Sequence, residues 1–112
     1  ANIKMLQGLG FEICSGGIIG MGESKEDVVD MLLELREIQP EALPINFLLP
    51  IPGTPLEHAD ISGLTTEYCL KVLCLARLLV PISAVLPDGK FILREKKKTC
   101  SAWWIPFSPP VT

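Results

Sequence analysis

A single glycine-rich stretch decides the fold of this chain, and it reads Cys14-Ser15-Gly16-Gly17-Ile18-Ile19-Gly20-Met21-Gly22-Glu23-Ser24. Residues 11–14 before it predict a short strand. Ser24 at its end predicts the start of a helix, because a serine hydroxyl can accept a hydrogen bond from a free amide of the first turn. Glycines permit the tight turn between the two. A strand, a glycine-rich turn and a helix in this order are typical of an α/β unit.

The flanking sequence continues this alternation. Residues 1–9 predict the last turns of a helix, residues 24–39 a helix ended by Pro40, and residues 65–79 a third helix. The nearly continuous apolar run at 42–49 predicts a parallel strand covered on both faces, and residues 82–86 predict a final short strand. The order indicates an α/β class with about three parallel strands and intervening helices. Three strands are too few to close a barrel, so both sheet edges would stay open.

Composition limits the possible classes of protein. The chain has 112 residues, of which 48% are hydrophobic, and a formal net charge of −3. This apolar content excludes an intrinsically disordered chain, and the length allows one modest domain. No run approaches the roughly 18 apolar residues of a membrane span, and no leader opens the chain, so we expect a cytoplasmic protein without membrane contact. Ala1 already stands in a helical pattern, which suggests a fragment.

The charge distribution separates two parts. Acidic residues outnumber basic ones over residues 1–88, and basic residues outnumber acidic ones over residues 89–112. We expect the second part to be a divergent, disordered tail. It contains three lysines at 96–98 near Trp103 and Trp104. Because no nucleic-acid-binding module surrounds them, we expect a solvated tail and no nucleic-acid partner.

Three motifs resemble the radical S-adenosylmethionine enzymes. The first is G-x-I-x-G-x-x-E, formed by Gly16, Ile18, Gly20 and Glu23. The second comprises Leu-Pro-Ile-Asn-Phe-Leu at 43–48 and Gly-Thr-Pro-Leu at 53–56, and the third is the helix end at 75–81. The Cys-Ser-Gly-Gly that opens the first motif resembles the biotin synthases in particular. The resemblance runs from about Ile3 to Val85.

The resemblance implies a fold and a reaction. Members of this family form an (α/β)8 barrel of the TIM type, so residues 1–88 would be a partial barrel. They are typically homodimers, in which a 4Fe–4S cluster on a C-x-x-x-C-x-x-C loop cleaves S-adenosylmethionine to a radical. That radical abstracts hydrogen from dethiobiotin, and a 2Fe–2S cluster deep in the barrel supplies the sulfur of biotin.

The resemblance also implies roles for residues of the first motif. Cys14 matches a thiolate ligand of the 2Fe–2S cluster, although from patterning alone it could be a small buried hydrophobe. Gly16, Ile18 and Gly20 match positions near the adenine of S-adenosylmethionine. The same glycines would serve a tight strand–helix turn, and the two roles are compatible. We expect Glu23 to be a structural residue at the start of the helix rather than a ligand.

The second motif supplies the remaining candidates. Asn46 matches an asparagine that contacts dethiobiotin, and an amide can both donate to and accept from a cyclic urea. Leu48 and Leu49 match the apolar wall near the adenosyl group. We expect Cys14, Ile18, Asn46 and one of these leucines to cluster at the carboxyl ends of adjacent strands. Cys14 and Asn46 at opposite ends of the sheet would overturn this site assignment.

The remaining candidate ligands are expected to have no function. We expect His58 to be solvated and the thiols of Cys69 and Cys74 to be inert on a core-packed helix. The four cysteines include no C-x-x-C pair, and His58 is the only histidine, so a closed zinc site is not expected.

The chain also departs from the family pattern. The C-x-x-x-C-x-x-C loop that would hold the 4Fe–4S cluster is absent, and Leu86 stands where the family has an arginine ligand. Beyond that point we expect the resemblance to end. We therefore expect no catalytic residue and no activity in the isolated chain. The main hypothesis is a fragment of a biotin-synthase-like enzyme, and the alternative is a degenerate remnant or a small α/β interaction module.

Overall fold

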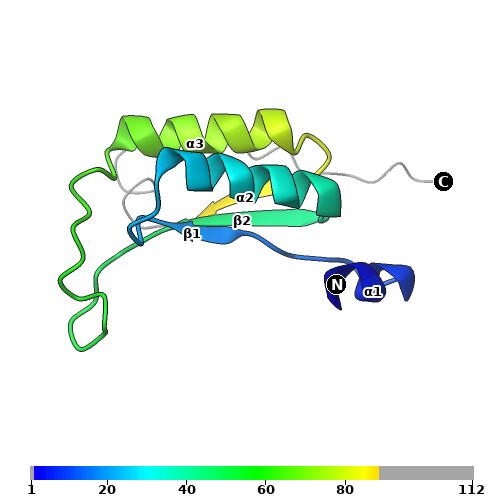
Figure 1. Ribbon diagram of the computed structural model, residues 1–112, viewed down its shortest axis with the longest axis horizontal. Helices are drawn as coiled ribbons and strands as arrows, with labels where there is room; N and C mark the ends of the chain where they lie inside the picture. The colour runs from blue at the N-terminus through cyan, green and yellow to red at the C-terminus, as the bar shows by residue number, and fades with distance from the viewer. Residues whose placement is uncertain (1, 89–112) are drawn as a thin grey trace.

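The computed structural model describes residues 2–88, which form three helices and three strands (Figure 1). In chain order the elements are α1 (Asn2–Gly8), β1 (Gly17–Ile19), α2 (Lys25–Ile38), β2 (Ala42–Phe47), α3 (Thr66–Leu79) and β3 (Ala84–Asp88). This confirms the α/β class and the predicted order of elements. The tail expected at residues 89–112 lies outside the described residues.

The strands form one parallel sheet in the order β1-β2-β3. Gly17 pairs with Ile45 across β1 and β2, and Leu43 pairs with Val85 across β2 and β3. Figure 1 shows α2 and α3 side by side on one face of this sheet, with α1 apart from that layer. Helix α2 therefore connects β1 to β2 and α3 connects β2 to β3, each as in a βαβ unit.

Local chemistry fixes both ends of α2. The Ser24 side chain accepts from the backbone amide of Asp27, and the Asp27 carboxylate accepts from the Ser24 amide at 2.8 Å. This reciprocal capping box confirms the predicted helix start. At the other end Gln39 adopts a left-handed conformation with φ 52°, and Pro40 follows. The helix therefore ends where the sequence predicts.

A buried serine ties the start of β3 to the chain that enters β2. Ser83 is fully buried, and its hydroxyl donates to the carbonyl oxygen of Pro40. Arg77 on α3 donates to the carbonyl oxygens of Pro81 and Ser83, each at 3.2 Å. These bonds hold the amino ends of β2 and β3 level with each other.

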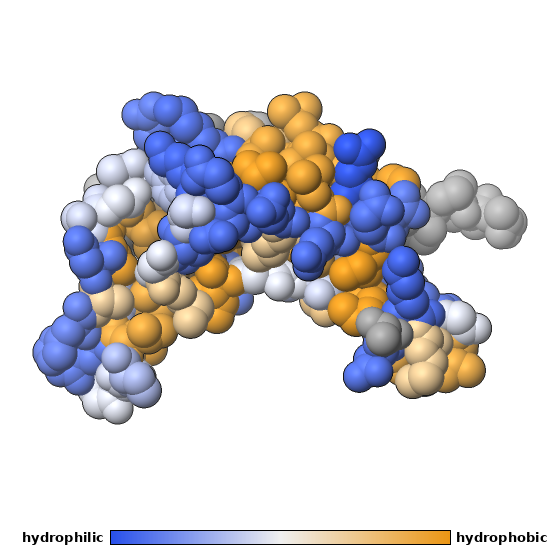
Figure 2. All heavy atoms as spheres, viewed as in Figure 1, coloured by the Kyte–Doolittle hydropathy of each residue, from blue (hydrophilic) through white to orange (hydrophobic). Residues whose placement is uncertain are grey.

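The hydrophobic core lies between the sheet and the two helices. Burial alternates along β2, where Leu43, Ile45 and Phe47 are buried and the residues between them are not. The expectation that this strand is covered on both faces is therefore wrong for the described chain, because α2 and α3 lie on the same side. Figure 2 shows the molecule as an arch with a hollow below the sheet, between α1 and the loop that follows β2.

One strand differs from its expected place. A strand was expected at 11–14, but β1 occupies Gly17–Ile19, within the predicted glycine-rich turn. Cys14 forms only a single parallel bridge to Ala42. Within residues 2–88 none of the helices combines the length and apolarity needed to cross a membrane.

Candidate functional site

The uncovered sheet face carries the candidate residues. Successive side chains of a strand point to opposite faces, so Ile18 is 49% exposed whereas the next residue, Ile19, is 1% exposed. Ile18 pairs with Asn46 in the neighbouring strand, and this register places both on the uncovered face. Cys14 pairs with Ala42, which lies on the same face as Asn46 because the two are four residues apart.

The candidates occupy two levels of this face. Cys14 lies level with Ala42, the first residue of β2, whereas Ile18 lies level with Asn46 near its carboxyl end. Four residues of strand correspond to about 13 Å. The expected single cluster is therefore wrong, because Cys14 lies toward the amino end of β2 and Asn46 near its carboxyl end. This separation overturns the assignment of both residues to one compact site. The cause is that the chain reaches the sheet at Cys14, three residues before β1 begins.

Cys14 presents an exposed thiol level with the amino end of β2. The backbone around it is anchored, because Ser15 N donates to Ala42 O at 3.1 Å and Ala42 N donates to Ile13 O at 3.2 Å. Because its thiol is exposed, the interpretation of Cys14 as a buried hydrophobe is wrong for the described chain. Within residues 2–88, no group of three or more His, Cys, Asp and Glu side chains could hold a metal ion. Cys14 can therefore contribute one ligand to a cluster but cannot hold one with its described neighbours.

Asn46 presents a side-chain amide near the carboxyl end of β2. Its side chain is half-buried and forms no hydrogen bond with any residue that the structure describes. An amide without a partner among the described side chains, which end at residue 85, has two donors and an acceptor. The geometry thus leaves Asn46 open to the surroundings of the uncovered face, beside Ile18.

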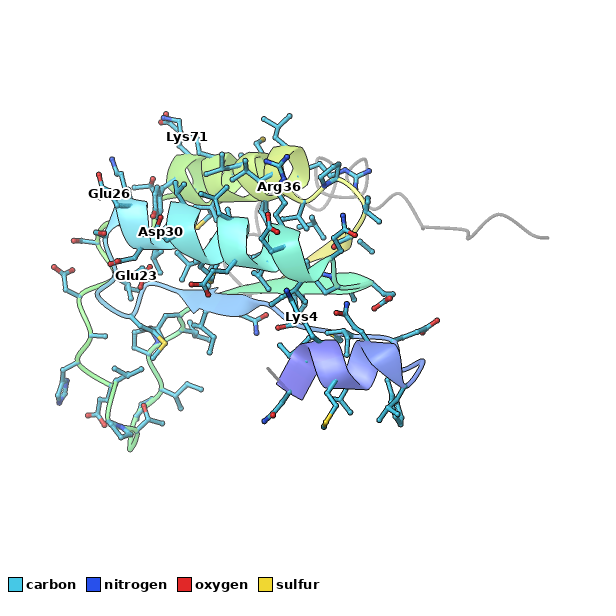
Figure 3. All side chains as sticks on the ribbon, turned by 45° about the vertical axis from the view of Figure 1, so that its right-hand side comes forward. Lys4, Glu23, Glu26, Asp30, Arg36 and Lys71 are labelled. Carbon is cyan, nitrogen blue, oxygen red and sulfur yellow. The ribbon has the colours of Figure 1, made fainter. Side chains whose placement is uncertain are left out.

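The glycine-rich loop above β1 is held by Glu23 (Figure 3). The two carboxylate oxygens of Glu23 accept from Gly20 N at 2.6 Å and from Met21 N at 2.7 Å. Gly20 has φ 107°, a conformation that favours glycine. The carboxylate of Glu23 is therefore engaged by its own loop, which agrees with the expected structural role.

Two leucines continue β2 beside this loop. Leu48 N donates to Ile19 O at 2.8 Å, which extends the pairing of the two strands by one bond. Leu49 follows it and is 45% exposed. Ile18 near the carboxyl end of β1 and Leu49 just beyond β2 thus both expose apolar side chains.

A cleft of about 550 Å³ lies on the other side of the glycine loop. Tyr68 and Lys71 of α3 line it together with Gly20, Glu23 and Lys25. Burial, and to a lesser degree the negative charge of Glu23, raises the pKa of Tyr68. Tyr68 and Lys71 belong to none of the sequence motifs. Only the packing of α3 brings them to the glycine loop, so the sequence alone contained no signal for them.

The remaining cysteines and the histidine lie away from the uncovered face. Cys69 is buried in the core, where burial raises the pKa of its thiol, and Cys74 is half-buried on the same helix. A buried thiol with a raised pKa is unreactive, as expected. His58 is exposed, with Nε2 3.3 Å from a carboxylate oxygen of Glu57. The expectation of a solvated His58 is confirmed.

Comparison with known proteins gives a consistent result. Residues 44–100 match the family model described as the Biotin and Thiamin Synthesis associated domain. A biotin synthase of Thermus thermophilus is 52% identical over 80 residues, which cover 70% of this chain and 24% of that protein. A biotin synthase of Clostridium botulinum is 46% identical over 97 residues, covering 86% of this chain and 30% of that protein.

The matched ranges also define the extent of the similarity. A biotin synthase of Persephonella marina is 47% identical over 99 residues, covering 87% of this chain and 29% of that protein. The chain thus spans about a quarter to 30% of the length of these relatives. The family model reaches residue 100, so the similarity extends further than Val85, where the sequence analysis ended it.

Proposed function

Because the chain belongs to the family of Biotin and Thiamin Synthesis associated domains, we propose that it forms part of the barrel of a biotin-synthase-like enzyme, which inserts sulfur into dethiobiotin. One observation carries the proposal. The uncovered sheet face presents a thiol from Cys14 at one level and an amide from Asn46, beside Ile18, at the other. A face that displays both groups suits a wall lining a reaction chamber.

The sheet has the form of a barrel segment. Its strands are parallel, its helices lie on one face, and β1 and β3 each pair with β2 alone among residues 2–88. In a TIM-type barrel the helices form the outer ring and the strands enclose the interior. We therefore assign the uncovered face to the barrel interior, with further strands joining at both edges.

The two iron–sulfur clusters of the family fit this chain unequally. The sequence has no C-x-x-x-C-x-x-C loop, so the residues present do not fit a 4Fe–4S cluster. A 2Fe–2S cluster, which in the family supplies the sulfur atom, needs several ligands, of which Cys14 can be one. Leu86 cannot replace the expected arginine as a ligand, because its side chain is a hydrocarbon. The other ligands must come from chain beyond this segment.

The residues near the carboxyl ends of β1 and β2 fit the adenosyl group of S-adenosylmethionine. Ile18 and Leu49 expose apolar side chains that can contact the face of an adenine, and both are about half exposed. Gly16 and Gly20 bracket Ile18, and their backbone groups can approach a flat base closely because glycine has no side chain. We assign these four residues to one wall of the S-adenosylmethionine site.

Asn46 is assigned to dethiobiotin. Its amide has no hydrogen-bond partner among residues 2–85, whose side chains the structure describes, and it can accept from a ureido N–H while donating to the ureido oxygen. In this role Asn46 binds and orients the substrate and takes no part in proton transfer. Homodimer formation and a cytoplasmic location belong to the same proposal, and both derive from the family resemblance.

A chimera tests the proposal directly. The part of this chain before Leu86 replaces its counterpart in the Thermus thermophilus biotin synthase, which supplies the remaining barrel and keeps its own residue at the position of Leu86. We expect biotin and 5′-deoxyadenosine to form when dethiobiotin, S-adenosylmethionine and a reductant are supplied. In the Cys14→Ala chimera, biotin formation is lost while 5′-deoxyadenosine is still produced.

Two further variants complete the test. Cys74→Ala is the matched control, because this half-buried thiol lies on α3 away from the uncovered face, and it should retain both products. Asn46→Ala should raise the KM for dethiobiotin by about tenfold, the equivalent of one lost hydrogen bond. Undiminished biotin formation by the Cys14→Ala chimera would contradict the proposal.

A further inference from the structure

We propose that Gly16 and Pro44 form a positioning pair that keeps Cys14 in register beside Ala42 on the uncovered face. This inference deepens the proposed function, since it rests on Cys14 being a cluster ligand. The two residues lie opposite each other, because the register that pairs Gly17 with Ile45 places Gly16 beside Pro44. Their contact lies between the Cys14 level and the Ile18–Asn46 level.

Gly16 approaches the backbone of β2 more closely than any other residue type could. A Cβ added at Gly16 would overlap the carbonyl oxygen of Pro44, and it would lie 3.0 Å from Pro44 Cδ. The obstructing atom belongs to the backbone of the central strand, so it cannot rotate away as a side chain can. A side chain at residue 16 must therefore displace the segment that carries Cys14.

Pro44 interrupts the hydrogen-bonded ladder because proline has no backbone N–H to donate. In a parallel pair, alternate residues direct both backbone groups to the same neighbouring strand. Ala42 does so, because its N–H donates to Ile13 O and its carbonyl accepts from Ser15 N. Residue 44 is the next to face this neighbour, but proline has no N–H, so one bond of the ladder cannot form.

The missing bond explains why Cys14 is separate from β1. The bridge of Cys14 to Ala42 stands alone, and regular pairing resumes only at Gly17. Between them the Gly16–Pro44 contact replaces the hydrogen-bonded ladder. The register is the same on both sides of this gap, because Cys14 pairs with Ala42 and Gly17 with Ile45. The Gly16–Pro44 contact thus keeps Cys14 in register where the ladder is interrupted.

The neighbouring glycine provides a matched control. A Cβ at Gly17 would meet only the sulfur and Cε of Met31, which are the far end of a flexible side chain. Gly17→Ala therefore adds the same methyl group one residue away, at a position where the obstacle can move. Gly16→Ala adds it where the obstacle is backbone.

A disulfide reports the position of Cys14 directly. Cys14 and Ala42 are bridge partners in adjacent strands, so their Cα atoms lie about 5 Å apart, within the range for a disulfide. In the full chain we introduce Ala42→Cys, oxidise it mildly and identify the cross-linked peptides by mass spectrometry. Protection of the buried Cys69 from alkylation reports in each variant that the core is folded.

The expected result separates the two glycines. Gly16→Ala should lower the yield of the Cys14 cross-link by at least about threefold, because displaced Cα atoms leave the range that a disulfide tolerates. Gly17→Ala should leave the yield unchanged, and Cys69 should stay protected in both. An unchanged yield in Gly16→Ala with Cys69 protected would overturn the inference. If Gly16→Ala exposes Cys69, the same comparison is repeated at a low temperature at which Cys69 is protected, and equal yields there would also overturn the inference.

The chimera distinguishes this inference from the proposed function. Its 2Fe–2S content, measured by absorbance and by iron per chain, should fall in Cys14→Ala and in Gly16→Ala but not in Gly17→Ala. A loss in Cys14→Ala without a loss in Gly16→Ala would refute the positioning role alone. No loss in Cys14→Ala would refute the ligand role on which it rests.

Discussion

Glu23 holds the glycine-rich loop with both oxygens of one carboxylate. The oxygens accept from the backbone amides of Gly20 and Met21. A charged acceptor strengthens such bonds, and two of them on one side chain fix the loop conformation. The residue therefore contributes to the site through the shape of the loop.

Replacing Glu23 should destabilise the chain without touching the uncovered face. Glu23→Ala removes two hydrogen-bond acceptors and should lower the free energy of unfolding by about 1–2 kcal/mol. Glu26→Ala is the control, since this exposed carboxylate on the first turn of α2 should cost only about 0.3–1 kcal/mol. Urea unfolding followed by circular dichroism measures both. Equal losses in the two variants would show that the loop bonds add nothing.

Asp27 makes stability depend on pH. Its hydrogen bonds with the backbone and side chain of Ser24 lower the pKa of this carboxyl. A lowered folded-state pKa means that the stabilisation is complete above the ordinary value of about 3.9 and is lost as pH falls through the folded-state value. Asp27→Asn should therefore flatten the loss of stability below about pH 4. Asp30→Asn, whose carboxylate accepts no hydrogen bond from a described residue, is the matched control, and an identical flattening there would exclude Ser24 as the cause.

At the scale of elements, α2 and α3 supply the core on one side of the sheet. Val28, Leu32 and Leu35 of α2 are buried, and they meet Val72 and Ala76 of α3 in the same cluster. Figure 3 shows that the labelled charged side chains of α2 and α3, Glu26, Asp30, Arg36 and Lys71, extend from the helix layer. The amphipathic pattern of each helix thus defines the covered face and leaves the other face to the candidate site.

Two adjacent leucines on α2 test this division. Leu32 is fully buried, whereas Leu33 is 40% exposed. Leu32→Ala should lower the free energy of unfolding by about 2–5 kcal/mol because it leaves a cavity in the core. Leu33→Ala should cost less than about 1 kcal/mol, since its side chain is only partly removed from water. Equal costs in a denaturant titration would mean that α2 packs with another face.

At the scale of the whole molecule, the described chain has one covered sheet face and two strand edges without a partner among residues 2–88. The hollow below the sheet in Figure 2 is bounded by α1 and by the loop after β2. An enclosed chamber would require further strands to close around this hollow. A site that depends on enclosure is therefore incomplete in the described residues.

The isolated 112-residue chain should form no biotin. Generating the radical requires three thiolates in a C-x-x-x-C-x-x-C loop, and this sequence has none of that spacing. Cys69 is buried and Cys74 lies on the same helix, so neither can substitute. The chain is reconstituted anaerobically with iron and sulfide and supplied with dethiobiotin, S-adenosylmethionine and a reductant. Biotin or 5′-deoxyadenosine above a blank without protein would show that the loop is dispensable.

The sequence by itself determined the elements and their order. The Ser24 capping pattern, the apolar periodicity of 25–38 and the prolines at 40 and 81 act within a few residues, so they predict the helix ends without the fold. The motifs likewise indicated the family, because residue types at fixed spacing are properties of the chain alone. The structural role of Glu23 and the solvation of His58 followed from equally local patterns.

Only the tertiary structure decided where the candidate residues lie. The sequence placed a strand at 11–14 and a turn at 18–22, whereas the sheet contains Gly17–Ile19 and reaches Cys14 through a single bridge. Strand pairing depends on a partner far away in the sequence, and here that partner carries Pro44, which interrupts the ladder. The two levels follow from this pairing, in which Cys14 lies beside Ala42 and Ile18 beside Asn46, and no local pattern could predict it.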